Sequence, residues 1–223
     1  PIDLEKINTY ELASRPSKVT VKDFASPLEA DDSLQKFLEK LPNILAVNSL
    51  REIAEAIKNA KKLDKPIIWG IGGHVIKTGL APILIDLMER GFITAIAANG
   101  SVLVHDTEIA LVGFTSEDVD ATLGEGDFGA AKETGEILNS AAKNGKIDYI
   151  GLGEAMGREV LKQNPKNADK SLLCQSYQKR IPFTAHLTIG ADIGNFHASA
   201  DGAALGETSH IDFKLFASIV KEM

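Results

Sequence analysis

The stretch from Pro66 to Ser101 constrains the fold of this chain more than any other. Two short apolar runs, 66–69 and 92–98, each lead into a turn that contains glycine, and the segment between them has helical spacing. The apolar residues of that segment that share one helical face are Leu80, Ile83, Leu84, Leu87 and Met88. Gly91 stands where a helix C-terminus favours a left-handed residue. Because such crossovers are right-handed, the pattern predicts a strand–helix–strand unit with both strands parallel in one sheet.

Pro82 limits where the helix of this unit can begin, because proline is tolerated in the first turn of a helix and not in its interior. We therefore expect the helix to start late, near Gly79. This start leaves residues 70–78 as a long loop for binding.

The turns after the two strands are the places to look for a ligand, since open parallel sheets bind ligands beyond the carboxyl ends of their strands. Those ends are Gly70–His74 and Asn99–Ser101. Glycines let backbone N–H groups approach an anion, and the start of the next helix favours negative charge. The Gly-x-Gly pattern at 70–72 is not a full dinucleotide fingerprint. A turn that only lets a strand pack on a helix is an equal alternative.

The rest of the chain continues the alternation of strands and helices. Further helices are expected at 31–41, 49–62, 130–142, 149–163 and 171–179, with a closing helix from about Ile211. Residues 181–187 read as a third parallel strand, and 1–30 as a loop-rich arm. The chain is thus predicted to be an α/β protein with a Rossmann-like parallel sheet and helices on both faces, forming one domain over 1–223. It starts at Pro1 and ends at Met223 within an apolar helical pattern, so we expect a truncated C-terminus.

Composition narrows the classes of partner. A net charge of −7 argues against a nucleic-acid binder. No apolar run approaches the ~18 residues of a membrane span, and residues 1–20 are too polar for a signal peptide. The single cysteine, Cys174, fits a reducing compartment. These observations predict a cytoplasmic protein that acts on a small molecule, with no nucleic acid and no membrane as partner.

Histidines and carboxylates gather behind the predicted strands. The residues concerned are His74, His105, His197 and His210, with Asp106, Glu108, Asp192 and Asp201 near them. This pattern is typical of a small-molecule site in an α/β fold. His74 either contacts a ligand or caps a helix. His105 and Asp106 are neighbours and must point in different directions, so only one of them is expected to reach a ligand.

Two other histidines have simpler interpretations. His210 reads as a residue at a helix start, and His186 as a residue on the face of a strand. His197 lies in the long segment 188–202, and loops of that length are often functional. Imidazole and carboxylate groups could also gather around a metal, but no His-x-x-x-His pair is present. We therefore predict no metal site and keep a metal-dependent hydrolase as the third alternative.

Several stretches together resemble the deoxyhypusine synthase family. Gly70–Gly79 takes the place of the family's Gly-x-x-Ser-Asn loop, and Ala97–Ser101 that of its Thr-Thr-Ala-Gly-Gly turn. Arg180–Gly190 resembles its later Ile-Pro-Val strand and Thr-Asp-Gly loop, and Val21–Phe24 its opening strand. The sequence departs from the family at Val104 and His105, where acidic residues are expected. It also has no lysine between Lys179 and Lys214.

The resemblance implies NAD as cofactor, a polyamine such as spermidine as substrate, a protein lysine as a further acceptor, and a homotetramer. It places the cofactor against Gly72, Gly73, His74, Asn99, Gly100, Ser101, Gly190 and Asp192. The proton-transfer group would be one of His105, Asp106 and His197, because such a group must titrate near neutral pH. The predicted activity is NAD-dependent amine oxidation with aminoalkyl transfer. The runner-up is an NAD-binding sensor or scaffold without catalysis.

All of these expectations rest on one spatial prediction. The turns after Trp69, Ala98 and Leu187 must meet at the same rim of the sheet to form one pocket.

Overall fold

The computed structural model describes residues 3–122, 124 and 126–223. The chain divides into two compact units, Pro1–Lys58 and Asn59–Met223. The first unit holds three short 3-10 turns, η1 (Leu4–Lys6), η2 (Leu12–Ser14) and η3 (Val21–Asp23). It also holds helix α1 (Leu34–Lys40) and most of α2 (Leu45–Lys62). Both predicted helices are confirmed, with α2 beginning earlier than expected. None of the residues of α1 or α2 is buried.

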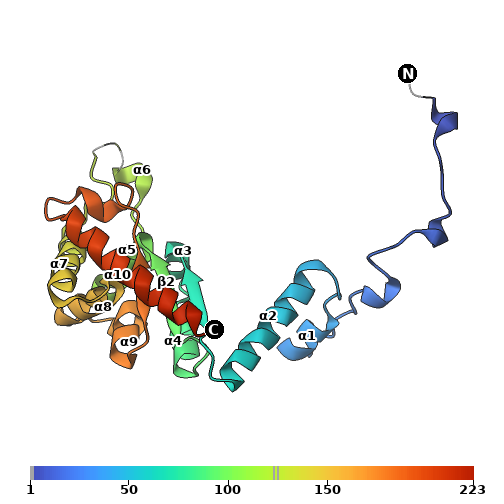
Figure 1. Ribbon diagram of the computed structural model, residues 1–223, viewed down its shortest axis with the longest axis horizontal. Helices are drawn as coiled ribbons and strands as arrows, with labels where there is room; N and C mark the ends of the chain where they lie inside the picture. Colours follow the sequence, from blue (N-terminus) through green and yellow to red (C-terminus); the bar gives the residue numbers. More distant parts are fainter. Residues whose placement is uncertain (1–2, 123, 125) are drawn as a thin grey trace. The chain divides into compact units, whose positions relative to one another are not determined.

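The second unit is built on a small parallel sheet (Figure 1). Within the described residues its strands are β1 (Ile68–Ile71), β2 (Ala95–Asn99) and β3 (Phe183–His186), in the order β1-β2-β3. Both pairs are parallel, with Trp69 opposite Ile96 and Ala98 opposite Ala185. The three carboxyl ends therefore lie along one edge of the sheet.

The crossover from β1 to β2 contains two helices where one was predicted. They are α3 (Gly73–Lys77) and α4 (Ala81–Glu89). The expected loop at 70–78 is wrong, because Gly70 and Ile71 end β1 and 73–77 form the short helix α3; Gly79 follows with a left-handed φ of +77°. Pro82 lies in the first turn of α4, and Gly91 follows that helix with a φ of +71°, so both of these predictions are confirmed.

Helices α5 to α9 connect β2 to β3. They are α5 (Gly100–Val112), α6 (Val119–Thr122), α7 (Lys132–Asp148), α8 (Leu152–Lys162) and α9 (Leu172–Lys179), with the 3-10 turn η5 (Ala168–Lys170) before α9. The predicted helices at 130–142, 149–163 and 171–179 correspond to α7, α8 and α9. The α/β class with a Rossmann-like parallel sheet flanked by helices is thereby confirmed. In the sheet layer α5 packs on β2 and β3, and α8 and α10 pack on β3.

Helix α5 lies in the middle of the core. Its buried residues are Gly100, Val102, Leu103, Val104, Asp106, Thr107 and Ala110, and they cover more than half of the helix circumference, while the remaining face, with Ser101, His105 and Glu108, is half-buried. A helix that is apolar all round is an interior helix. It packs with the fully buried side chains Ile96, Leu152, Met156, Leu172 and Leu205.

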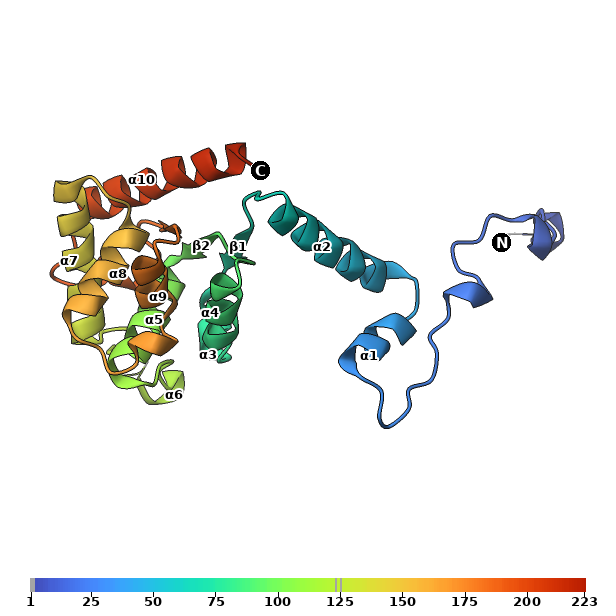
Figure 2. The ribbon, with the colours of Figure 1, turned by 90° about the horizontal axis from the view of Figure 1, so that it is seen from below.

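The closing helix α10 (Gly202–Lys221) begins earlier than the predicted start at Ile211. The carboxylate of Asp201 caps it by accepting hydrogen bonds from the N–H groups of Ala203 and Ala204, at 2.9 and 3.1 Å. His210 therefore lies inside the helix, and its interpretation as a helix-start residue is wrong. Figure 2 shows α10 running along one side of this unit, with the C-terminus at its end.

Helix α10 covers the outer edge of β3. Asp212 Oδ2 accepts a hydrogen bond from the N–H of Ala185 at 2.8 Å, and Ser209 Oγ accepts one from Leu187 at 3.0 Å. Ser209 Oγ in turn donates to the carbonyl of Ala185 at 3.0 Å. These side chains replace a neighbouring strand, so the edge offers fewer free groups for pairing with another chain.

Asp212 is completely buried and also accepts a hydrogen bond from Gly153 N at the start of α8, at 2.9 Å. Burial raises its pKa to about 7, although the hydrogen bonds from Ala185 and Gly153 pull it down in part. Oδ1 has no partner among the described residues. One carboxylate thus joins α10, β3 and α8 while remaining easy to protonate.

None of the helices in the described part of the chain is long and apolar enough to cross a membrane.

We predict that replacing Asp212 by Asn reduces the pH dependence of stability. An unfolded aspartate titrates near ~3.9, so between pH ~4 and ~7 the folded protein holds a proton that the unfolded chain has lost. The contribution of this group to stability is complete below that window and is lost as pH rises through about 7. Chemical denaturation from pH 4 to pH 8 should show a smaller decline in unfolding free energy for Asp212→Asn than for the wild type. Equal declines would contradict this role.

Gly153 provides a sharper test of packing between α8 and β3. A Cβ at this position would lie 1.9 Å from the carbonyl oxygen of Phe183, a backbone atom that cannot rotate away. Gly153→Ala should therefore destabilise the protein by roughly 2–4 kcal/mol, the range of a severe core defect. The matched control is Gly206→Ala in α10, where nothing lies within 4 Å and the helix should gain up to ~1 kcal/mol. Thermal unfolding of both variants measures the difference, and equal stability would show that α8 can shift freely.

Candidate functional site

The turns after β1, β2 and β3 meet at the carboxyl edge of the sheet, as predicted. The N–H of Gly73 donates to Ser101 Oγ at 3.1 Å, which joins the first turn to the second. Ser101 Oγ donates to Asn99 Oδ1 at 2.9 Å. A Cβ on Gly100 would lie 2.6 Å from the carboxyl carbon of Asp192, so the third turn closes over the second. The three segments form one continuous rim.

Two small cavities lie behind this rim. The first, of about 120 Å³, is lined by the start of α5, by the 187–195 turn and by Leu138 and Leu205. The second, of about 130 Å³, is lined by residues that include Lys77, Glu108, Gly129 and Thr134. His105 lines both cavities and therefore stands in the wall between them.

The predicted cofactor residues are distributed around the rim. Gly72 is the N-cap of α3, and Asn99 is the N-cap of α5. His74 is exposed on α3 and lines neither cavity. Gly190 is exposed with a φ of +84°, while Asp192 lines the first cavity and accepts a hydrogen bond from Thr188 N at 2.6 Å. Of this set, Gly100, Ser101 and Asp192 line the first cavity, whereas Gly72, Gly73, His74, Asn99 and Gly190 line neither.

His105 and Asp106 point in opposite directions from α5, as expected. The side chain of His105 is 17% exposed and faces the cavities, whereas Asp106 is 0% exposed. The carboxylate of Asp106 accepts hydrogen bonds from Ser171 Oγ at 2.5 Å and from the N–H groups of Leu172 and Leu173 at 2.8 and 2.9 Å. It therefore anchors the start of α9 and has no exposed atom with which to touch a substrate. Burial raises its pKa to about 6, against the lowering effect of these hydrogen bonds.

His197 also has a packing role. Its ring stacks on Phe196 with the centroids 4.9 Å apart, and its Nε2 lies 3.3 Å from the carbonyl oxygen of Gly129. A Cβ on Gly135 would lie 2.1 Å from its Nδ1, so the ring is pressed against α7. It lines neither of the two cavities. The long segment 188–202 thus packs His197 against α7 and the turn at Gly129, and not into either cavity.

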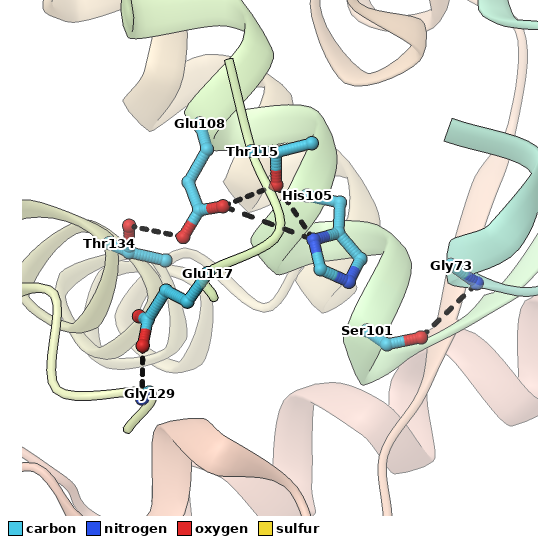
Figure 3. A network of polar contacts seen from close by, with 8 residues as sticks. All are labelled: Gly73, Ser101, His105, Glu108, Thr115, Glu117, Gly129 and Thr134. Atoms are coloured by element: carbon cyan, nitrogen blue, oxygen red, sulfur yellow. Dashed lines mark hydrogen bonds and ion pairs between the residues drawn. The ribbon is translucent and has the colours of Figure 1, made fainter. Parts of the chain in front are cut away.

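A polar network connects His105 to the first turn of α7 (Figure 3). His105 Nδ1 lies 2.7 Å from Thr115 Oγ1, and the Thr115 hydroxyl donates to Glu108 Oε2. Thr134 Oγ1 donates to the other carboxylate oxygen of Glu108 at 3.3 Å. His105 Nδ1 is 3.9 Å from Glu108 Oε2. Thr115 and Glu108 therefore fix the orientation of the imidazole ring, and Thr134 in turn holds Glu108.

Glu108 is ionised in this network. Its burial would raise its pKa, but His105, Thr115 and Thr134 together outweigh that effect and hold the pKa below its usual value. Sequence reasoning placed Glu108 near the histidines but gave it no role. The spacing of three between His105 and Glu108 could have shown that both lie on one helical face. Nothing in the sequence points to Thr115.

A larger cavity of about 460 Å³ lies on the other side of Glu108. Leu111, Val112 and Phe114 form its apolar wall, and Glu117 and Glu133 are also at its surface. Glu117 Oε2 accepts a hydrogen bond from Gly129 N at 3.0 Å, which ties the 115–117 segment to the turn before α7. Across residues 3–122, 124 and 126–223, no three His, Cys, Asp or Glu side chains are grouped so that they could hold a metal ion.

The fold and the glycine-bearing rim define a protein of the Rossmann class. Residues 51–164 match the family described as "Arginine dihydrolase ArgZ-like, C-terminal, Rossmann fold". This match covers half of the chain, and the chain belongs to that family.

The chain is also similar to a protein named ornithine cyclodeaminase from Methanothermobacter thermautotrophicus. The two are 31% identical over 101 residues, which are 45% of this chain and 24% of the relative. The matched part thus spans about a quarter of the length of that relative.

These matches show that the resemblance to deoxyhypusine synthase is wrong, together with the polyamine, spermidine and aminoalkyl-transfer expectations that followed from it. The error has a physical source. Glycine-bearing turns after parallel strands are shared by many dinucleotide-binding sheets, since all of them must admit a phosphate close to the backbone. Val104 and His105, where the deoxyhypusine synthase family is expected to have acidic residues, were better evidence about the family than the glycine-bearing turns.

We predict that Asp106 is a structural residue. Asp106→Ala would leave three buried donors without an acceptor, each at a cost of ~1–3 kcal/mol, so the variant should lose at least ~3 kcal/mol of stability. The matched control is Asp86→Ala, which removes only an exposed ion pair with Arg90 and should cost less than ~1 kcal/mol. Urea denaturation of both variants gives the comparison. A stable Asp106→Ala variant would return this residue to the list of candidates for catalysis.

Proposed function

We propose that the second unit of this chain binds NAD or NADP and serves chemistry on a small amino acid, with ornithine as the substrate. The family supports the Rossmann class, and the name of the relative supports ornithine as a substrate. The observation that carries the proposal is the open space at the end of β1. A Cβ on Gly70 would meet nothing within 4 Å, and one on Gly72 would meet only Asn99 Nδ2, at 3.8 Å. This opening allows a pyrophosphate to approach the backbone, as in dinucleotide sites.

The start of α5 adds a second favourable feature for a phosphate. No side chain caps this helix end at Asn99, so the first N–H groups of α5 are left for another acceptor. The carboxylate of Asp192 lies against Gly100 at this end. This carboxylate would have to move away before a phosphate could approach the first N–H groups of α5, because the two groups repel each other. The open backbone at Gly70 and Gly72 and the uncapped start of α5 support a dinucleotide site once Asp192 has moved.

The first cavity is smaller than a ligand site of this kind. Its 120 Å³ compares with the roughly 300–1,000 Å³ of typical small-molecule pockets. We therefore expect the turn that carries Asp192 to move outward when a dinucleotide binds. Gly72, Gly73 and the start of α5 would then hold the phosphates, and Asn99 and Ser101 would orient the groups beside them. A bound nicotinamide would supply reversible hydride transfer to and from the amino acid.

The chain contains one tryptophan, Trp69, which directly precedes the glycine turn and therefore reports on this site. Titration with NADH or NADPH should quench Trp69 emission and transfer energy to the reduced nicotinamide. Gly72→Asp places a carboxylate among the proposed phosphate ligands and should weaken binding at least about tenfold, or ~1.4 kcal/mol. The variant should still fold, because Gly72 has extended backbone geometry and space for a side chain.

Gly206→Asp is the matched control, since it adds the same charge in α10, where nothing lies within 4 Å of a new Cβ. It should bind the dinucleotide like the wild type. With NAD bound, L-ornithine should produce a further change in Trp69 emission, whereas spermidine should not. A wild-type protein that binds neither NADH nor NADPH would end the proposal. Equal losses in both Asp variants would show a general charge effect.

A further inference from the structure

The imidazole of His105 is placed to exchange a proton at the rim. A Cβ on Gly73 would lie 2.9 Å from His105 Cδ2, so one ring edge lies against the glycine turn between β1 and α3. Figure 3 shows Nδ1 directed toward Thr115 and Glu108, with Nε2 on the side of the ring that faces away from them. No hydrogen bond joins Nε2 to any other group in the described parts of the chain.

Counting hydrogens in the network fixes the tautomer of the neutral ring. Glu108 is an ionised carboxylate and can only accept hydrogen bonds. Thr115 has one hydroxyl hydrogen, which it donates to Glu108. The contact of 2.7 Å between Thr115 and His105 therefore needs its hydrogen from Nδ1. It follows that Nε2 carries a free lone pair.

Thr134 also restrains Glu108, because its hydroxyl donates a hydrogen bond to the second carboxylate oxygen and so ties the carboxylate to α7. The charged groups that face His105 are Glu108 of its own helix, Lys77 of α3, Glu117 of the segment before α6 and Asp192 of the turn after β3. Three of the four are acidic, and Glu108 Oε2 lies 3.9 Å from the ring nitrogen.

We propose that His105 is the proton acceptor of this site, acting through Nε2, and that Thr115 and Glu108 are positioning residues that hold its ring in the Nδ1–H tautomer. In the reaction Nε2 forms a bond to a proton of the substrate ammonium group. The electrons of the broken N–H bond remain on the substrate nitrogen, which becomes a neutral amine. The Glu108 carboxylate stabilises the resulting imidazolium, as a buried carboxylate does for a histidine base elsewhere. The identity of the proton donor rests on the proposed function, whereas the tautomer does not.

Nitrogen-15 NMR of the histidine rings tests the tautomer without any ligand. The chain has five histidines, and the spectrum of His105→Asn assigns the signal of interest by its loss. The wild type should show His105 as Nδ1–H with an unprotonated Nε2 at neutral pH. Thr115→Val should remove this preference, and Thr115→Ser should restore it. The signal of His186, whose Nε2 lies beside Thr184, should stay unchanged as an internal control.

An Nε2–H tautomer in the wild type, or a tautomer that is the same in Thr115→Val, would overturn the proposal. The second measurement uses NAD-loaded protein with ornithine. His105→Gln should lower turnover at least about 100-fold while dinucleotide binding, followed by Trp69, stays within about threefold. Thr115→Val should shift the acidic limb of the pH–rate profile, and Thr115→Ser should return it. Unchanged turnover in His105→Gln would also overturn the proposal. A wild-type protein that does not bind a dinucleotide would instead count against the proposed function.

Discussion

The burial of α5 is the constraint on which the second unit of this protein depends. The helix starts directly from the carboxyl end of β2 and is surrounded by the sheet and by α7, α8 and α9. Because Val112, at the end of the helix, is its one fully exposed residue, packing fixes the position of α5. Two neighbouring polar side chains of the helix then serve different purposes. Asp106 turns into the core and holds α9, while His105 turns toward the rim of the sheet.

Three acidic side chains show how surroundings divide similar groups into separate roles. Asp106 and Asp212 are wholly buried and accept hydrogen bonds mainly from backbone N–H groups, and their pKa values are raised to about 6 and about 7. Both join helices and strands. Glu108 is partly buried, and its hydrogen bonds with His105, Thr115 and Thr134 keep its pKa low. It is therefore the carboxylate of the three that remains charged beside a titratable partner.

The sequence predicted the elements with strong periodicity or a clear stop signal. The β1–helix–β2 unit, Pro82 in a first turn and Gly91 after a helix were all correct, because each depends on local geometry. It also predicted that the three turns would meet, since parallel strands share their carboxyl edge. It could not show that residues 100–112 form one helix, because the apolar residues are spread around the helix and leave no clear stripe to read. The start of α10 was missed because its cap, Asp201, reads as part of a polar loop.

The candidate site was predictable only in part, for a related reason. A strand end indicates where side chains gather, but it does not indicate which way they point. His105 and Asp106 are neighbours that differ completely in exposure, and His197 is drawn onto α7 by contacts that no local pattern contains. Thr115 depends on a turn that brings the chain back against α5. The resemblance to the deoxyhypusine synthase family was misleading because glycine-bearing turns indicate a class of fold and do not indicate a substrate.

The central claim is that the carboxyl edge of this sheet is a dinucleotide site whose closed form is held by Asp192. A crystal structure of the protein with NADH tests it most directly. The account predicts the pyrophosphate against Gly72, Gly73 and the first N–H groups of α5, with the Asp192 carboxylate displaced from Gly100. A nucleotide bound at any other part of the chain, or an Asp192 that keeps its place while the nucleotide is bound, would contradict it.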